Sequence, residues 1–179
     1  MNSRMLAAVA AISIAALGSA SCSDDDPGGP SGQPTTFVFT STLTAANEVP
    51  PVSNSESTAS GSVNLTMNVT RDTTGTITAA TGTFVVNMTG FGAGTAITAA
   101  HIHPGAAGQV NGPAVNLALG NGEIVLTTGA GSFTKTAIPI TTAQADQLIA
   151  SPAAFYFNVH TTLNPGGAIR GQLALQSSQ

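Results

Sequence analysis

The chain has 179 residues, of which only 7% are charged, and its formal net charge at pH 7 is −4. Its four cations, Arg4, Arg71, Lys135 and Arg170, are far apart in the sequence and form no basic patch, which excludes nucleic acid as a partner. Thr, Val and Gly are abundant whereas Lys, Arg and Glu are scarce. This composition is typical of an all-β domain with many turns.

The N-terminal segment has the pattern of a targeting sequence. Residues 1–21 combine Arg4, an apolar run over residues 5–17 and then small residues, which predicts a bacterial-type signal peptide. Cys22, the only cysteine, follows directly and opens a flexible tether over residues 22–35. We therefore expect an exported protein. It is either a cell-envelope lipoprotein, on the periplasmic or surface side, whose only membrane contact is a lipid on Cys22, or a secreted protein released by ordinary signal-peptide cleavage.

From residue 36 onward, short segments alternate apolar and polar residues, as half-buried strands do. The clearest is residues 59–70, where Val63 and Leu65 alternate with Asn64 and Thr66. Pattern and turn residues together predict strands within residues 36–44, 59–70, 76–90 (one or two strands), 112–120, 122–128, 131–140, 154–162 and 167–176.

One segment, residues 141–150, has the signals of a helix. Thr141 and Gln144 have the spacing of a capping box, and Pro152 stops the helix. The strand number and spacing predict an antiparallel Greek-key-type β-sandwich or flattened barrel of about eight strands over residues 36–176. We expect the helix to cross between the sheets, and a domain of this length can bury a core without disulfides.

All three histidines fall into two short motifs, His101 and His103 in H-x-H and His160 in N-x-H. In a strand, residues i and i+2 share a face with Cα atoms roughly 6.5–7 Å apart, so His101 and His103 project together. His160 shares a face with Asn158, opposite apolar neighbours, so we expect it to point out of the core. If the two strands are neighbours, three imidazoles converge on a site that suits Cu or Zn with an open fourth position.

A structural polar network is an alternative interpretation of the same residues. The histidines and Asn158 would then hydrogen-bond to loop backbone, and the domain would be a structural or adhesive surface module. Glu48 and Arg170 form the most plausible internal ion pair in a chain so poor in charge. A site for a small ligand, a protein or a glycan also stays open.

Four motifs occur in order: NEVPPV (residues 47–52), AHIHPGAAGQVNGPAV (100–115), FYFNVHT (155–161) and NPGGAIRGQL (164–173). Together they resemble the signature of the CHRD family, the domain first named in chordin, over about residues 36–176. Animal members of that family are extracellular and bind bone morphogenetic proteins, whereas bacterial members are exported single-domain proteins of undefined role. The resemblance therefore implies an exported or lipid-anchored binding module, without the growth-factor role.

A more distant likeness is to the copper–zinc superoxide dismutase sandwich, in which an H-x-H pair, a later histidine and an arginine build the copper site. His101 and His103 match the H-x-H pair, His160 matches the later histidine, and Arg170 matches the arginine. The chain lacks the bridging histidine and the His/Asp cluster that would hold zinc in that enzyme. We expect a module that is not an enzyme and binds Cu or Zn; a dismutase-like copper redox enzyme is the alternative.

Overall fold

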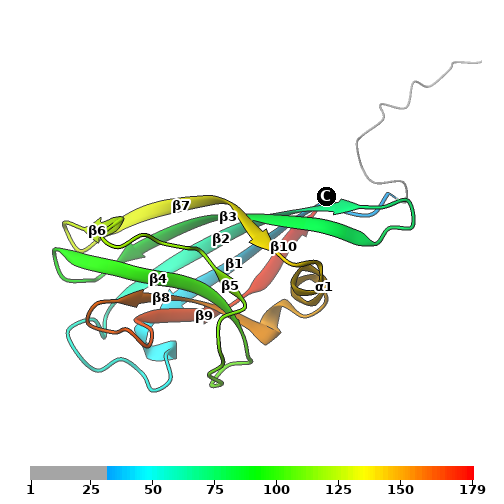
Figure 1. Ribbon diagram of the computed structural model, residues 1–179. Coiled ribbons are helices and arrows are strands. Elements are labelled where there is room, and N and C mark those ends of the chain that lie inside the picture. The colour runs from blue at the N-terminus through cyan, green and yellow to red at the C-terminus, as the bar shows by residue number, and fades with distance from the viewer. Residues whose placement is uncertain (1–31) are drawn as a thin grey trace, which may run out of the picture.

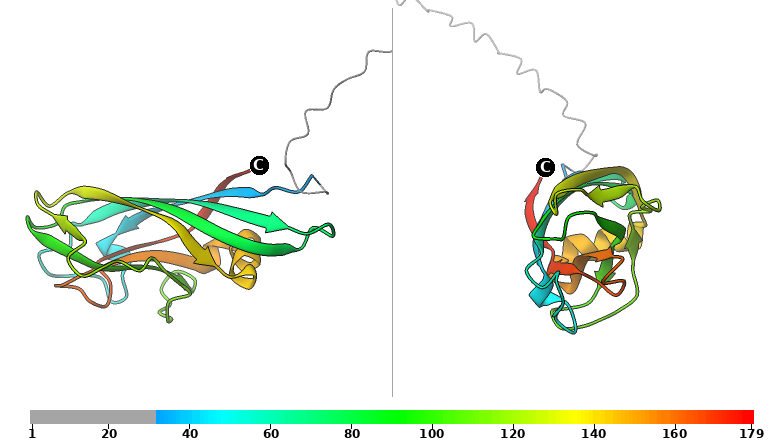
Figure 2. Two further views of the ribbon diagram at one scale, coloured as in Figure 1. Left: turned by 45° about the horizontal axis from the view of Figure 1, so that its top comes forward. Right: turned by 90° about the vertical axis from the view of Figure 1, so that its left-hand side faces the viewer.

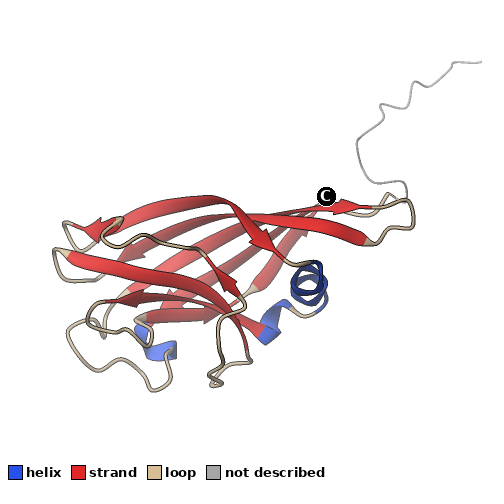
Figure 3. Ribbon diagram, viewed as in Figure 1, coloured by secondary structure: helices blue, strands red, loops and turns tan. Residues whose placement is uncertain are grey.

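The computed structural model describes residues 32–179 (Figure 1). The predicted signal peptide, Cys22 and most of the predicted tether lie outside the described residues. Strands dominate the described part, as Figure 3 shows. The elements are β1 (Thr36–Thr44), η1 (Ala45–Asn47), β2 (Ser60–Arg71), β3 (Ile77–Thr89), β4 (Thr95–Pro104), β5 (Val115–Asn116), β6 (Ile124–Leu126), β7 (Gly131–Ile140), α1 (Thr142–Ala150), η2 (Pro152–Ala154), β8 (Phe155–Thr161), β9 (Ile169–Gln172) and β10 (Ala174–Ser178).

The strands form one continuous antiparallel sheet in the order β5-β4-β8-β9-β1-β2-β3-β7, with β10 paired to β1 and β6 paired to β4. The sheet curls into a nearly closed, flattened barrel, which the end-on view of Figure 2 shows. The predicted all-β antiparallel class is confirmed, in its barrel form. The expected crossover of the helix between two sheets is wrong. The helix α1 connects β7 to β8, and both strands belong to the same sheet.

Strand lengths differ from the expectation in several segments. Residues 76–90 form a single strand, and the C-terminal run divides into β9 and β10. The runs 112–120 and 122–128 contribute only the short strands β5 and β6. β5 ends early because the Asn116 side chain accepts a hydrogen bond from the Ala118 backbone N–H at 2.7 Å, which turns the chain away from the ladder.

The core fills the inside of the barrel because inward-facing positions of each strand are apolar. Leu65 on β2, Phe84 on β3 and Phe157 on β8 are fully buried there, and the two phenylalanine rings lie 6.0 Å apart. Burying each of these side chains contributes roughly 1.5–3 kcal/mol to folding. On β8 this alternation points Phe157 and Val159 inward, and it leaves the residues between them on the outer side of the barrel wall.

The predicted capping box begins α1. The Thr141 side chain accepts from the Gln144 backbone N–H at 3.3 Å, and the Gln144 side chain accepts from the Thr141 backbone N–H at 2.8 Å. Thr141→Ala is expected to cost about 1 kcal/mol of stability, because the N-cap acceptor is lost. Thermal melting should show a decrease of roughly 3–4 °C, given the size of the domain. Thr142→Ala, at an exposed position one residue later, is the control; equal loss in both variants would contradict the capping role.

Candidate metal centre

The register between neighbouring strands brings the predicted site residues together. On β4 and β8, His101 lies opposite Asn158, and His160 lies two pairs further along, opposite Ala99. On β8 and β9, Asn158 lies opposite Arg170. The prediction that His160 approaches the H-x-H pair is therefore met by the structure, because β4 and β8 are adjacent strands.

The three imidazole rings form one cluster. His101 Nδ1 lies 3.0 Å from His160 Nε2, and the His101 and His103 ring centroids are 5.4 Å apart. One potential ligand nitrogen from each ring can be chosen so that all three lie within 4.8 Å of one another. An ion with metal–nitrogen bonds of about 2.0–2.1 Å requires separations of about 3.3–4 Å. The ligand atoms are spread over as much as 4.8 Å, so binding an ion would draw the rings closer together.

Backbone carbonyls determine which nitrogens of two rings face the cluster. His103 Nδ1 lies 2.7 Å from the Asn111 carbonyl oxygen, and His160 Nδ1 lies 2.9 Å from the Pro165 carbonyl oxygen. Because a carbonyl can only accept, both Nδ1 atoms carry the proton, and both Nε2 atoms of the neutral rings are unprotonated. The Nε2 atom of His103 is buried and has no hydrogen-bond partner among the described residues. A histidine held by its other N–H on a carbonyl is the arrangement that metal ligands adopt.

Asn158 lies at the centre of this polar face. Its side-chain oxygen is 3.1 Å from His160 Nε2, and its side chain is only 2% exposed. An amide group offers either a donor to the histidine lone pair or an oxygen to a bound cation. Asn158 therefore belongs to the same cluster as the histidines.

Loops cover the cluster from the outside of the barrel. His160 points away from the apolar core as expected, but it is 8% exposed, and His103 is 6% exposed. The covering segments are those that supply the carbonyl groups of Asn111 and Pro165. Only His101 among the three is partly open to solvent.

Burial keeps the three histidines neutral. Desolvation lowers the pKa of His101 to about 4, with further lowering from the charges of His160 and His103. Desolvation likewise lowers the pKa of His103 and that of His160, against the opposing effect of their backbone hydrogen bonds. A metal ion binds the neutral form of imidazole, so the ligand set needs no deprotonation at neutral pH.

Tyr156 is a site residue that the sequence interpretation did not include. Its ring lies parallel to His103, with 4.8 Å between centroids and 3° between planes. The guanidinium carbon of Arg170 lies 3.6 Å from the centroid of the same ring. Because β8 runs between β4 and β9, Tyr156 is flanked by His103 on one strand and Arg170 on the other. The alternation along β8 places Tyr156 on the same face as Asn158, so the sequence contained the information needed to include Tyr156 in the site.

The predicted contact ion pair between Glu48 and Arg170 is wrong. Among residues 32–179, the only side-chain ion pair is Lys135–Glu123, at 2.9 Å. The Glu48 carboxyl packs against Gly167, where an added Cβ would lie 2.6 Å from both carboxyl oxygens. The Arg170 guanidinium is held by Tyr156 and by a 3.0 Å hydrogen bond to the Gln109 carbonyl oxygen.

Burial of Glu48 makes stability depend on pH. Desolvation raises the pKa of Glu48 to about 7, although Arg170 partly lowers it. Because the folded-state pKa exceeds the unfolded value near 4.5, the folded state binds a proton more tightly, and stability from this group is lost as pH rises from about 4.5 to 7. The three histidines act in the opposite direction, losing stability as pH falls below 6.5. Comparing the pH dependence of stability in the wild type with that in a Glu48 variant separates the contribution of Glu48 from that of the histidines.

Glu48→Gln is expected to gain about 2 kcal/mol relative to wild type between pH 5 and pH 8, because the amide cannot ionise. Urea unfolding at a series of pH values measures this difference. Asp146→Asn, which changes an exposed carboxyl on α1, is the matched control. A Glu48→Gln difference that does not vary with pH would contradict the raised pKa.

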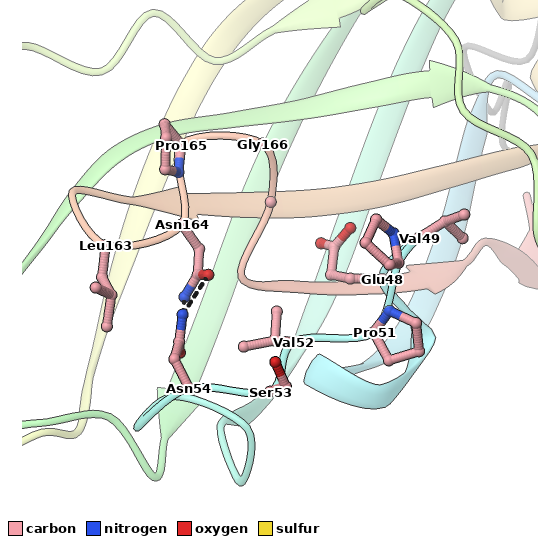
Figure 4. Close-up of a pocket in the computed structure, with 12 residues that line it drawn as sticks. Glu48, Val49, Pro51, Val52, Ser53, Asn54, Leu163, Asn164, Pro165 and Gly166 are labelled. Carbon is pink, nitrogen blue, oxygen red and sulfur yellow. Dashed lines mark hydrogen bonds between the residues drawn. The ribbon is translucent and has the colours of Figure 1, made fainter.

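A pocket of about 320 Å³ lies beside the cluster, between residues 48–54 and residues 163–167 (Figure 4). The Asn54 and Asn164 amides join its two walls by a 2.8 Å hydrogen bond. The Asn164 amide also donates to the buried Glu56 carboxylate at 2.6 Å. The wall that carries Pro165 is therefore anchored at several points, which holds in place the carbonyl group that orients His160.

Fold and site together define the class of this protein: an antiparallel β-barrel-like domain with a covered three-histidine cluster on its outer wall. The family model of the CHRD domain matches residues 39–173, and the chain belongs to the CHRD domain family. No curated protein and no solved structure is significantly similar to the chain. Within residues 32–179, none of the helices has the length and apolar character needed to cross a membrane.

Proposed function

We propose that this protein is an exported CHRD-domain binding module that holds a transition metal, copper or zinc, through His101, His103 and His160. The site would operate in the cell envelope or outside the cell. The expected N-terminal signal and Cys22 are the basis for that location. Fractionation of cells that produce the wild type and Cys22→Ser tests it, because loss of the lipid should move the protein from the membrane to the soluble fraction.

The observation that carries the metal proposal is the buried Nε2 atom of His103, which has no hydrogen-bond partner within residues 32–179. A purely structural network would be expected to satisfy each buried polar atom, because an unpaired one costs about 1–3 kcal/mol. His103 and His160 are each held at Nδ1 by a backbone carbonyl, and only the Nε2 atom of His103 is left without a partner among residues 32–179, since that of His160 lies within hydrogen-bond distance of His101 and Asn158. A metal ion would use the lone pair of His103 and would replace the contact between His101 and His160.

Calorimetric titration of the purified protein with Cu(II) and with Zn(II) tests this proposal. We expect one ion per chain, an increase in melting temperature on binding, and loss of both effects when all three histidines are replaced by alanine. The control replaces Asn64, Asn68 and Asn87, exposed polar residues on other strands, and should bind as the wild type does. Absence of binding to the wild type would favour the structural or adhesive interpretation. Superoxide turnover by the loaded protein would be the signature of the redox-enzyme alternative.

A further inference from the structure

The three-histidine cluster supplies no negative charge to a bound ion. Among the described residues, the group of side chains that could ligate a metal consists of His101, His103 and His160, without a carboxylate or a thiolate. The Nδ1–H groups of His103 and His160 are both engaged with backbone carbonyls, which disfavours their loss to form an anionic imidazolate. Any positive charge on the ion therefore stays uncompensated by its protein ligands.

A fixed cation lies close to this neutral ligand set. Arg170 is 2% exposed, and its guanidinium carbon lies 3.6 Å from the centroid of the Tyr156 ring, which itself stacks on His103 at 4.8 Å. Among residues 32–179 no carboxylate lies within ion-pair distance of the guanidinium, although Glu48 is near enough for its charge to interact with that of Arg170. The stack of Tyr156 on His103 therefore places the buried charge of Arg170 close to the histidine cluster.

The neutral ligand set and the nearby charge of Arg170 both weaken the binding of ions that carry a higher charge. The cost of burying an ion grows steeply with its charge, and the repulsion from Arg170 grows in proportion to it. At separations of several ångströms in a protein, that repulsion weakens binding on the order of tenfold for each unit of charge on the ion. Imidazole nitrogen suits copper, and three such ligands are sufficient for monovalent copper.

We propose that the His101–His103–His160 site prefers Cu(I) to Cu(II) and Zn(II), and that Arg170 sets this preference. The inference rests on the proposed function, that these histidines bind a metal. Arg170 is assigned as a specificity-determining residue that acts through Tyr156 and does not itself ligate the ion.

The first test ranks the affinities of the wild-type protein. Cu(I) affinity is measured by competition with bicinchoninate under nitrogen with ascorbate, and Cu(II) and Zn(II) affinities by competition with chromophoric chelators. We expect Cu(I) to bind more than about tenfold more tightly than either divalent ion. A divalent ion that binds as tightly as Cu(I), or more tightly, would overturn the preference and leave metal binding intact. Binding of no metal at all would instead overturn the proposed function.

The second test removes the charge of Arg170. Arg170→Gln should shift the ratio of Cu(II) to Cu(I) affinity on the order of tenfold toward Cu(II), which lowers the reduction potential by about 59 mV. Arg170→Lys keeps the charge and should shift the ratio less. Arg71→Gln, which removes a guanidinium at the turn between β2 and β3, should leave the ratio unchanged.

Circular dichroism confirms that each variant is folded before its affinity is measured. An unchanged ratio in folded Arg170→Gln, or an equal shift in Arg71→Gln, would remove Arg170 from the explanation. If Arg170→Gln does not fold, two measurements decide the proposal. They are the order of the Cu(I), Cu(II) and Zn(II) affinities of the wild type, and the ratio of Cu(II) to Cu(I) affinity of Arg170→Lys.

Discussion

Replacing His103 with phenylalanine is expected to lower the affinity for copper and for zinc by more than about 100-fold, beyond the 10–100-fold effect of losing an outer hydrogen-bond partner. Phenylalanine keeps an aromatic ring against Tyr156, 4.8 Å away in the wild type, but has no nitrogen to offer an ion. The melting temperature without metal should fall by a few degrees, because the variant loses the hydrogen bond from His103 Nδ1–H to the Asn111 carbonyl oxygen, worth roughly 0.5–1.5 kcal/mol.

Titration calorimetry of His103→Phe beside wild type measures the affinity, and far-ultraviolet circular dichroism checks the strands. His103→Gln is an informative companion, because it keeps a polar group near the Asn111 carbonyl but loses the ring. Wild-type affinity in folded His103→Phe would remove this residue from the metal site and reduce the cluster to two ligands.

Replacing Arg170 with alanine is expected to destabilise the fold by about 3 kcal/mol. The hydrogen bond from the guanidinium to the Gln109 carbonyl is charge-assisted and worth roughly 1.5–3 kcal/mol, and the desolvated stack on Tyr156 is worth up to about 2 kcal/mol. The variant also leaves Glu48 buried with no nearby cation, so its pKa should rise further above its ordinary value. For a domain of this size, the melting temperature should fall on the order of 10 °C.

Differential scanning calorimetry at pH 6 and pH 8 measures this loss. Arg170→Met is the matched control, because it keeps the volume of the aliphatic stem but removes the charge and its hydrogen bond. We expect Arg170→Met to recover part of the loss. Melting of Arg170→Ala at the wild-type temperature would contradict the role of the guanidinium in holding the Gln109 loop on β9.

Strand identity could be predicted wherever alternation is strong and the turn signals are clear. β2 and α1 are examples, since β2 alternates over its whole length and α1 begins at the expected Thr141 capping box. β5 and β6 are much shorter than the sequence suggested. The Gly- and Asn-rich run around them allows local side-chain turns, such as the one at Asn116, to compete with ladder pairing.

The residues of the site could be predicted from the sequence, but their burial and their contacts could not. The period of two along β8 placed His160 with Asn158, and it would also have indicated Tyr156. Burial of His160 could not be foreseen, because the segments that cover it are distant in sequence or lie in an irregular loop. The Glu48–Arg170 ion pair was predicted from scarcity of charge alone, and the structure turns each side chain toward a different neighbour.

The sequence by itself determined the class of fold, the family motifs and the three histidines on the polar faces of two strands. These properties depend on composition and on the alternation of residues that are close together in the sequence. Only the tertiary structure decided that β4 and β8 are neighbours in the register that joins the three rings. It also decided that distant loop carbonyls orient two of the rings and that Arg170 stacks beside them. Strand register and loop packing are set by contacts between segments far apart in the chain, which no local pattern contains.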